Sequence, residues 1–212
     1  MDRALEAFAE GEAARKEGYY ASAVGCYREA LSLSEQSSQL EIWRVHHALG
    51  VCLTKLSRFG VASTKLNEAL IHAPREEIAT IARDLAICLL KYGGAEVALN
   101  RIEESLRATP LHEYEERGTS ISVRAQIKLK LHMTREALED FGLADSLLQR
   151  GDNRHYELYN LLPFVEALMD NGEWRHVIVH FDRAMRLLNE YGNQSHHERF
   201  ARIEQLLAHV ST

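Results

Sequence analysis

The sequence predicts an all-α protein built as a stacked array of helical hairpins, and two spacing patterns together with the composition predict it. In the first pattern, a small residue is followed four positions later by a bulky apolar residue and three positions after that by another small one. Five such sets recur at intervals of 39, 36, 39 and 40 residues: Ala23/Tyr27/Ala30, Ala62/Leu66/Ala69, Ala98/Ile102/Ser105, Ala137/Phe141/Ala144 and Val177/Phe181/Ala184. A repeat of this length in helical spacing is typical of stacked helical arrays.

The second pattern runs twelve residues upstream of the first and consists of Gly11, Gly50, Ala86, Ala125 and Val165. It predicts a second helix in every repeat. Small side chains let two helix axes come close, and the bulky residue of the first pattern fills the adjoining groove. Between the two helices lie turn signals with Gly18, Gly60, Gly93-Gly94 and Gly172, whereas the fourth turn, His132-Met133-Thr134, contains no Gly or Asn.

The composition supports this all-helical reading. Only three prolines occur in 212 residues, and 46% of the residues are hydrophobic, enough for a continuous core. After the last set, Phe200, Ile203 and Leu207 follow a one-faced helical pattern that predicts a capping helix over about 195–210. The five hairpins are predicted at about 4–37, 43–76, 79–112, 118–151 and 158–191. No linker rich in Pro, Gly or Ser interrupts them, so we expect one domain over residues 1–212.

The hairpins resemble the tetratricopeptide repeat (TPR) family. The second unit carries Ala48-Leu49-Gly50, then Phe59, Ala62, Leu66, Ala69-Leu70 and a closing Pro74. The third unit carries Leu85-Ala86, Gly93, Ala98, Ile102 and Pro110. The other units depart from the family pattern: Lys128 stands at an apolar position, and Val165 and Val177 replace small residues. The resemblance implies a right-handed superhelical solenoid of about five repeats, some with helices or linkers lengthened by a turn.

The sequence contains no pattern that indicates catalysis or a cofactor. It has no phosphate-binding loop, no G-x-S-x-G turn and no dinucleotide-binding glycine motif, so we expect no enzyme activity. His176 and His180 have the spacing of a helical metal-ligand pair, but no third ligand is evident, and no metal site is expected.

Localisation and redox state are read from the termini and the cysteines. No run approaches the roughly 20 apolar residues that a membrane-spanning helix needs, and Met1–Lys16 lacks a basic start followed by an apolar run. A cytoplasmic location is therefore expected. Cys26, Cys52 and Cys88 are interpreted as reduced, buried small residues, because stacked helices hold Cys52 and Cys88 too far apart for a disulfide.

The resemblance implies that the first helix of each hairpin lines a concave groove. The implied partner-binding residues are Arg15, Lys16, Arg44, His47, Lys55, Arg83, Lys91, Gln126 and Lys130. Val51, Ile87, Ser122, Leu162 and Glu166 occupy further groove positions. The charges of the first four units are nearly all positive, although the chain as a whole has a net charge of −6. A groove of this kind suits an acidic extended peptide or a partner helix.

We therefore expect a scaffold or adaptor that binds a segment of another protein in a basic groove. Two alternatives stay open: a sensory or regulatory TPR module of the peptide-receptor or transcription-regulator type, and a self-assembling TPR protein. Nucleic acid is not expected as a partner, since the chain is acidic and its groove positions offer few aromatic rings for base stacking. A membrane is not expected either.

Overall fold

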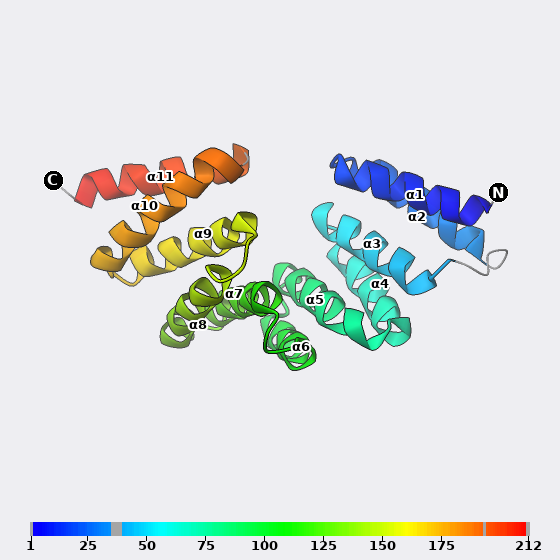
Figure 1. Cartoon of the computed structure of the whole chain (residues 1–212), viewed down its shortest axis with the longest axis horizontal. Coiled ribbons are helices and arrows are strands. Elements are labelled where there is room, and N and C mark those ends of the chain that lie inside the picture. Colours follow the sequence, from blue (N-terminus) through cyan, green and yellow to red (C-terminus); the bar gives the residue numbers. More distant parts are fainter. Residues whose placement is uncertain (1, 35–39, 193, 211–212) are drawn as a thin grey trace. The chain divides into compact units, whose positions relative to one another are not determined.

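The predicted all-α class is confirmed. The computed structural model describes residues 2–34, 40–192 and 194–210, and within them it has eleven α-helices and one short 3-10 helix (Figure 1). The α-helices are α1 (Arg3–Lys16), α2 (Tyr20–Ser32), α3 (Ile42–Lys55), α4 (Phe59–His72), α5 (Ile78–Tyr92), α6 (Ala95–Ala108), α7 (Tyr114–Lys130), α8 (Thr134–Leu148), α9 (Arg154–Asp170), α10 (Trp174–Tyr191) and α11 (Gln194–Val210).

The helices pair consecutively into five antiparallel hairpins, and α11 follows the last of them. Relative to the predicted ranges, α1, α3 and α5 begin one residue earlier, whereas α7 and α9 begin four residues earlier and reach 17 residues each. Residues 35–37 of the first predicted range lie outside the described residues. The chain divides into two compact units, Met1–Ala108 with three hairpins and Thr109–Thr212 with two hairpins and α11, and each is described by itself.

One residue with positive φ closes every hairpin. These residues are Gly18, Ser57, Gly93, His132 and Gly172, and they recur at the intervals of the sequence repeat. In each turn the following N–H donates to the carbonyl five residues earlier, as Arg58 N does to Leu53 O at 2.8 Å. This is the Schellman arrangement that normally favours glycine. The second turn differs from the prediction, because Gly60 lies inside α4 and Ser57 takes the left-handed conformation with φ 59°.

The two sequence patterns meet inside each hairpin. Gly11 and Gly50 are buried on first helices, and a Cβ built on Gly50 would lie 2.6 Å from Cγ of Leu66 on the second helix. The same construction on Gly11 gives 2.6 Å to the Tyr27 ring. The bulky residue therefore occupies the space that the small residue leaves open. Of the fifteen members of the first pattern, fourteen are buried, and Phe181 in the fifth set is half-buried.

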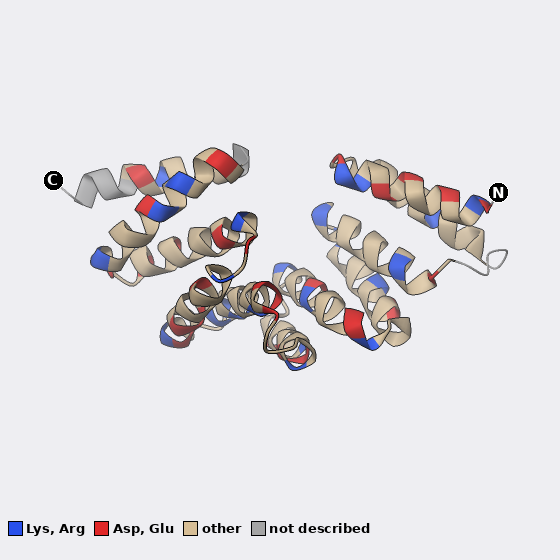
Figure 2. Ribbon diagram, in the orientation of Figure 1, with Lys and Arg blue, Asp and Glu red and all other residues tan. Residues whose placement is uncertain are grey.

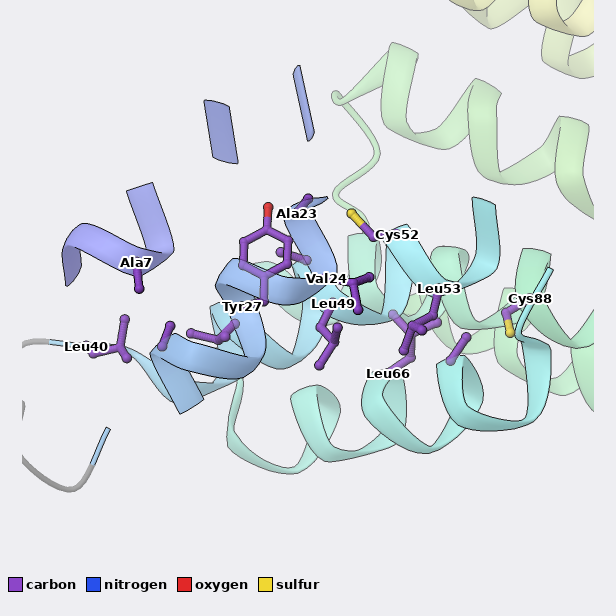
Figure 3. Packing of buried hydrophobic residues seen from close by; sticks show 14 of the residues in the cluster. Ala7, Ala23, Val24, Tyr27, Leu40, Leu49, Cys52, Leu53, Leu66 and Cys88 are labelled. Atoms are coloured by element: carbon purple, nitrogen blue, oxygen red, sulfur yellow. The ribbon is translucent and has the colours of Figure 1, made fainter. Parts of the chain in front are cut away.

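The core of the first unit runs continuously through its hairpins (Figure 3). Tyr27, Leu49, Leu53 and Leu66 are among its largest buried side chains, and Cys52 and Cys88 belong to the same cluster. Burial raises the pKa of the Cys52 thiol to about 11, so this thiol is protonated at neutral pH. All three cysteines are free, and Cys52 and Cys88 are buried as expected, whereas Cys26 is only half-buried.

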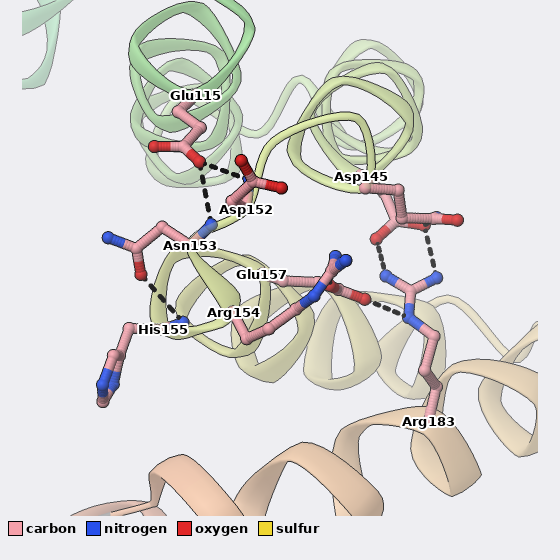
Figure 4. Close-up of polar contacts among 9 residues, drawn as sticks. Glu115, Asp145, Asp152, Asn153, Arg154, His155, Glu157 and Arg183 are labelled. Atoms are coloured by element: carbon pink, nitrogen blue, oxygen red, sulfur yellow. Dashed lines mark hydrogen bonds and ion pairs between the residues drawn. The ribbon is translucent and has the colours of Figure 1, made fainter.

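The second unit replaces part of its apolar packing with buried ion pairs. In the fourth hairpin Arg124 donates two hydrogen bonds to Asp140, at 2.8 and 2.7 Å, and Lys128 lies 2.7 Å from the same carboxylate. This explains why Lys128 stands where the TPR pattern has an apolar residue. In the fifth hairpin Arg183 of α10 contacts Asp145 of α8 and Glu157 of α9 (Figure 4). Charges thus connect three successive helices.

Candidate functional site

A pocket of about 310 Å³ lies on one face of the first unit, where α1, α3 and α5 supply the walls. We call it the α1–α3–α5 pocket. Its lining residues are Phe8, Glu12, Arg15, Trp43, Arg44, His47, Ala48, Val51, Glu77 and Asp84. All of these elements are the first helices of hairpins, together with the turn that precedes α5. The resemblance to the TPR family implied binding residues on these first helices.

The wall formed by α1 is held in place by a hydrogen-bonded triad. Arg15 donates to Glu12 at 3.1 and 2.7 Å, and the Tyr27 hydroxyl donates to Glu12 at 2.6 Å. Burial opposes ionisation of Glu12, but the hydrogen bonds from Arg15 and Tyr27 outweigh it and lower the pKa of the carboxyl. The same pair raises the pKa of Arg15. Arg15 is therefore a charged group already bound to a carboxylate.

The rest of the lining comes from α3, α5 and the residue before α5. His47 of α3 lies 2.7 Å from the carboxylate of Asp84 on α5, and this contact joins the two helices. Arg44 places its guanidinium 5.4 Å from the centre of the Phe8 ring, within cation–π range. Its ion pair with Glu41 is long, at 3.5 Å, and its side chain is 53% exposed. Arg44 is thus the cation of the pocket that is most open to a ligand.

The charges around the pocket are mixed. Two arginines face Glu12, Glu77 and Asp84, and Figure 2 shows residues of both signs along α1 and α5. The sequence pointed to a nearly uniform basic stripe, whereas the folded pocket combines two cations, three carboxylates and an apolar wall of Phe8, Trp43 and Val51.

Known proteins resemble this chain in structure. No family model and no curated protein matches its sequence. A Rap protein complexed with competence and sporulation factor aligns with a TM-score of 0.81 and 15% identity over 93% of this chain. The Rap conjugation gene regulator of plasmid pLS20, in complex with the Phr* peptide, gives 0.76 and 13% over 94%. A thermophilic TPR protein of Thermus thermophilus gives 0.71 and 15% over 94% of this chain and 97% of its own. This chain has a TPR fold.

At sequence identities of 13 to 15%, these similarities show a common fold only. The chain also spans only 57% of the length of each of the two Rap structures. Within the TPR fold, the pocket lies on the first helices of the first three repeats, where the resemblance placed the groove positions.

The fold brings together three of the nine predicted binding residues. Arg15, Arg44 and His47 line the α1–α3–α5 pocket. Lys16, Lys55 and Lys91 are exposed but do not line it, and Arg83 is buried, with 8% of its surface exposed. Gln126 and Lys130 lie on α7 in the second unit. Of the further groove positions, Val51 lines the pocket, whereas Ser122 and Leu162 are buried.

Six lining residues were not predicted as groove positions, and one of them, Ala48, appeared only as part of the TPR motif. Trp43 lies one helical turn before His47 and Glu12 lies three residues before Arg15, so helical spacing contained a signal for both. Phe8 likewise lies four residues before Glu12. Asp84 and Glu77 carried no such signal, because their approach to α3 depends on how the hairpins stack.

The possible metal-ligand pair of the sequence, His176 and His180, contacts other side chains of the protein. His176 lies 3.0 Å from Glu173, while the His180 ring packs 4.6 Å from the centre of the Phe164 ring. Burial lowers the pKa of His180. Among the described residues no group of three or more His, Cys, Asp or Glu could hold a metal ion. None of the described helices combines the length and the apolarity that crossing a membrane requires.

The Glu12 triad gives a pH-dependent prediction. A carboxyl whose pKa is lower in the folded state stabilises the fold above its unfolded pKa, and this contribution is lost as the pH falls through the folded value. We expect Glu12→Gln to lower the free energy of unfolding by about 1 kcal/mol at pH 7. The difference from wild type should shrink as the pH falls below about 4. Urea denaturation at a series of pH values measures this, with Glu10→Gln on the exposed side of α1 as the control.

Proposed function

We propose that the protein is an interaction module that holds a peptide segment of a partner protein in the α1–α3–α5 pocket. The observation that carries this proposal is the combination of an open cation, Arg44, with the apolar side chains of Phe8, Trp43 and Val51 in one pocket. An extended peptide provides both kinds of group within a few residues. The Rap complex with the Phr* peptide, which has the same fold, supports a peptide as the ligand.

The mixed lining of the pocket favours a more specific ligand than the uniformly acidic peptide expected from the sequence. Arg15 and His47 are each engaged by a carboxylate of the protein, so Arg44 is the group best placed to bind an acidic side chain. We therefore propose a peptide with one acidic residue next to an apolar or aromatic residue, instead of a uniformly acidic one. The apolar side chain packs on Trp43 and Phe8 while the carboxylate reaches Arg44.

The test uses a library of random dodecapeptides displayed on phage, selected on the wild-type protein. Affinities of the selected peptides are then measured by fluorescence anisotropy. We expect Arg44→Glu to weaken binding at least about tenfold, or 1.4 kcal/mol. Lys55→Glu, an equal charge change on an exposed position of the same helix, should bind as wild type does. Unchanged affinity in Arg44→Glu, or a selection without binders, would refute the proposal.

A second candidate function is a peptide-responsive regulator. The fold likeness to a Rap conjugation gene regulator over 94% of this chain favours it. A regulator must change state when its ligand binds, since a ligand shifts an equilibrium only through different affinities for the two states. Hydrogen exchange with and without a selected peptide separates the two functions: protection confined to the pocket supports an adaptor, and protection that extends to distant helices supports a regulator.

A further inference from the structure

A second pocket adjoins the first on the other side of α3. It has a volume of about 570 Å³ and lies between the beginning of α3 and the end of α4. We call it the α3–α4 pocket. Its lining residues are Leu40, Ile42, Trp43, His46, Lys65, Glu68 and His72. Trp43 lines both pockets.

The helical geometry of α3 explains this arrangement. Each residue of an α-helix is rotated by about 100° from the one before. His46 and His47 therefore lie on either side of Trp43, about 60° and 40° around the helix. His47 faces the α1–α3–α5 pocket, where it meets Asp84, and His46 faces the α3–α4 pocket, where its Nδ1 lies 2.9 Å from Glu68. Trp43 is the boundary between the two faces.

The lining of the α3–α4 pocket has a defined chemistry. Leu40, Ile42 and Trp43 form an apolar side, and Ile42 is 42% exposed. The other lining residues are three nitrogen-bearing side chains, His46, Lys65 and His72, and one carboxylate, Glu68. Glu68 is engaged by Lys65, at 2.7 Å, and by His46. The Lys65 ammonium has further N–H groups, and His72 is exposed at the end of α4. An acidic group next to an apolar side chain complements this surface.

We propose that the peptide bound in the α1–α3–α5 pocket continues over Trp43 and occupies the α3–α4 pocket as a second subsite. There it packs an apolar side chain on Ile42 and Trp43 and directs a carboxylate to Lys65 and His72. The inference rests on the proposed function and adds to it the path and the second anchor of the ligand. An extended peptide advances about 3.3 Å per residue, so roughly three to four residues suffice to pass over one indole ring.

The experiment uses the dodecapeptides selected above, which are long enough to reach both pockets. Ile42→Ser and His72→Glu change the α3–α4 pocket alone, and Arg44→Glu changes the α1–α3–α5 pocket alone. Ile71→Ser is the matched control, because Ile71 is 74% exposed on α4 and lines neither pocket. Each peptide is also cut into two hexapeptides. Every variant is first shown to melt as wild type does.

We expect full-length peptides to bind about tenfold more weakly to His72→Glu and at least about threefold more weakly to Ile42→Ser, and to bind Ile71→Ser normally. One hexapeptide should respond to Arg44→Glu only, and the other to the α3–α4 variants only. Sensitivity to Arg44→Glu without sensitivity to Ile42→Ser or His72→Glu would overturn the second subsite and leave the proposed function intact. Sensitivity to the α3–α4 variants without sensitivity to Arg44→Glu would overturn both, as would insensitivity to all three.

Discussion

Replacing Arg183 by methionine is expected to lower the free energy of unfolding of the second unit by about 3 kcal/mol. Arg183 is the shared partner of Asp145 and Glu157, whose side chains are only 8% and 5% exposed. Methionine keeps much of the volume but removes the charge. Two buried carboxylates are then left close to each other with their main cation gone, although Arg154 still lies 2.9 Å from Glu157 and Gln149 still donates to Asp145.

Urea denaturation followed through Trp174 fluorescence measures this loss, because Trp174 begins α10 in the second unit. A Trp43→Phe background leaves Trp174 as the sole tryptophan of the chain. Arg186→Met is the control, since Arg186 lies on the exposed side of the same helix. If Arg183→Met unfolds at the same urea concentration as Arg186→Met, the network contributes nothing to stability, and the fifth hairpin is held by its apolar contacts alone.

Replacing Gly50 by leucine is expected to cost up to about 3 kcal/mol in the first unit. Even a single Cβ at this position would lie 2.6 Å from Leu66 Cγ and 3.3 Å from the Ala62 carbonyl oxygen. The Leu66 side chain can rotate away, but the backbone of α4 cannot, so a leucine must force the two helices apart. Here Trp43 fluorescence in a Trp174→Phe background reports the unfolding of the first unit.

The matched control is Gly25→Ala on α2. A Cβ built on Gly25 meets nothing within 4 Å, so this change should instead stabilise the helix by about 0.5 to 1 kcal/mol. The two substitutions are therefore expected to change the free energy of unfolding in opposite directions. A destabilisation of Gly50→Leu that Leu66→Ala partly relieves would assign the cost to this contact. If Gly50→Leu is as stable as wild type, α3 and α4 pack less tightly at this position than the structure shows.

The hairpins could be predicted from the sequence because their determinants are local. Gly50 and Leu66 are sixteen residues apart and belong to one hairpin, so a helical period is enough to bring them together. Lys128 appeared as a departure from the pattern, since its partner Asp140 looks like an ordinary polar residue of the next helix. The left-handed conformation of Ser57 could not be predicted from the sequence either, because glycine and asparagine are the residues that usually adopt it.

The site was predicted only in part, for a related reason. The resemblance to the TPR family placed Arg15, Arg44 and His47 on first helices, and these three residues line the α1–α3–α5 pocket; their role in binding stays a prediction. The carboxylates that engage two of them were not foreseen. Asp84 is 37 residues from His47, and its position depends on the stacking of separate hairpins. The resemblance also placed Arg83 in the groove, yet its immediate neighbour Asp84 lines the pocket and Arg83 is buried.

The five turns have a consequence for how this chain tolerates change. In every hairpin the residue with positive φ lies seven positions after the small residue of the first helix and five before that of the second. All of the variation in repeat length, from 36 to 40 residues, therefore falls outside this thirteen-residue segment. The turns act as fixed-length modules, and the outer helix ends together with the connectors between hairpins take up insertions and deletions. A hairpin exchanged at its connectors for another from the same chain would keep its internal register.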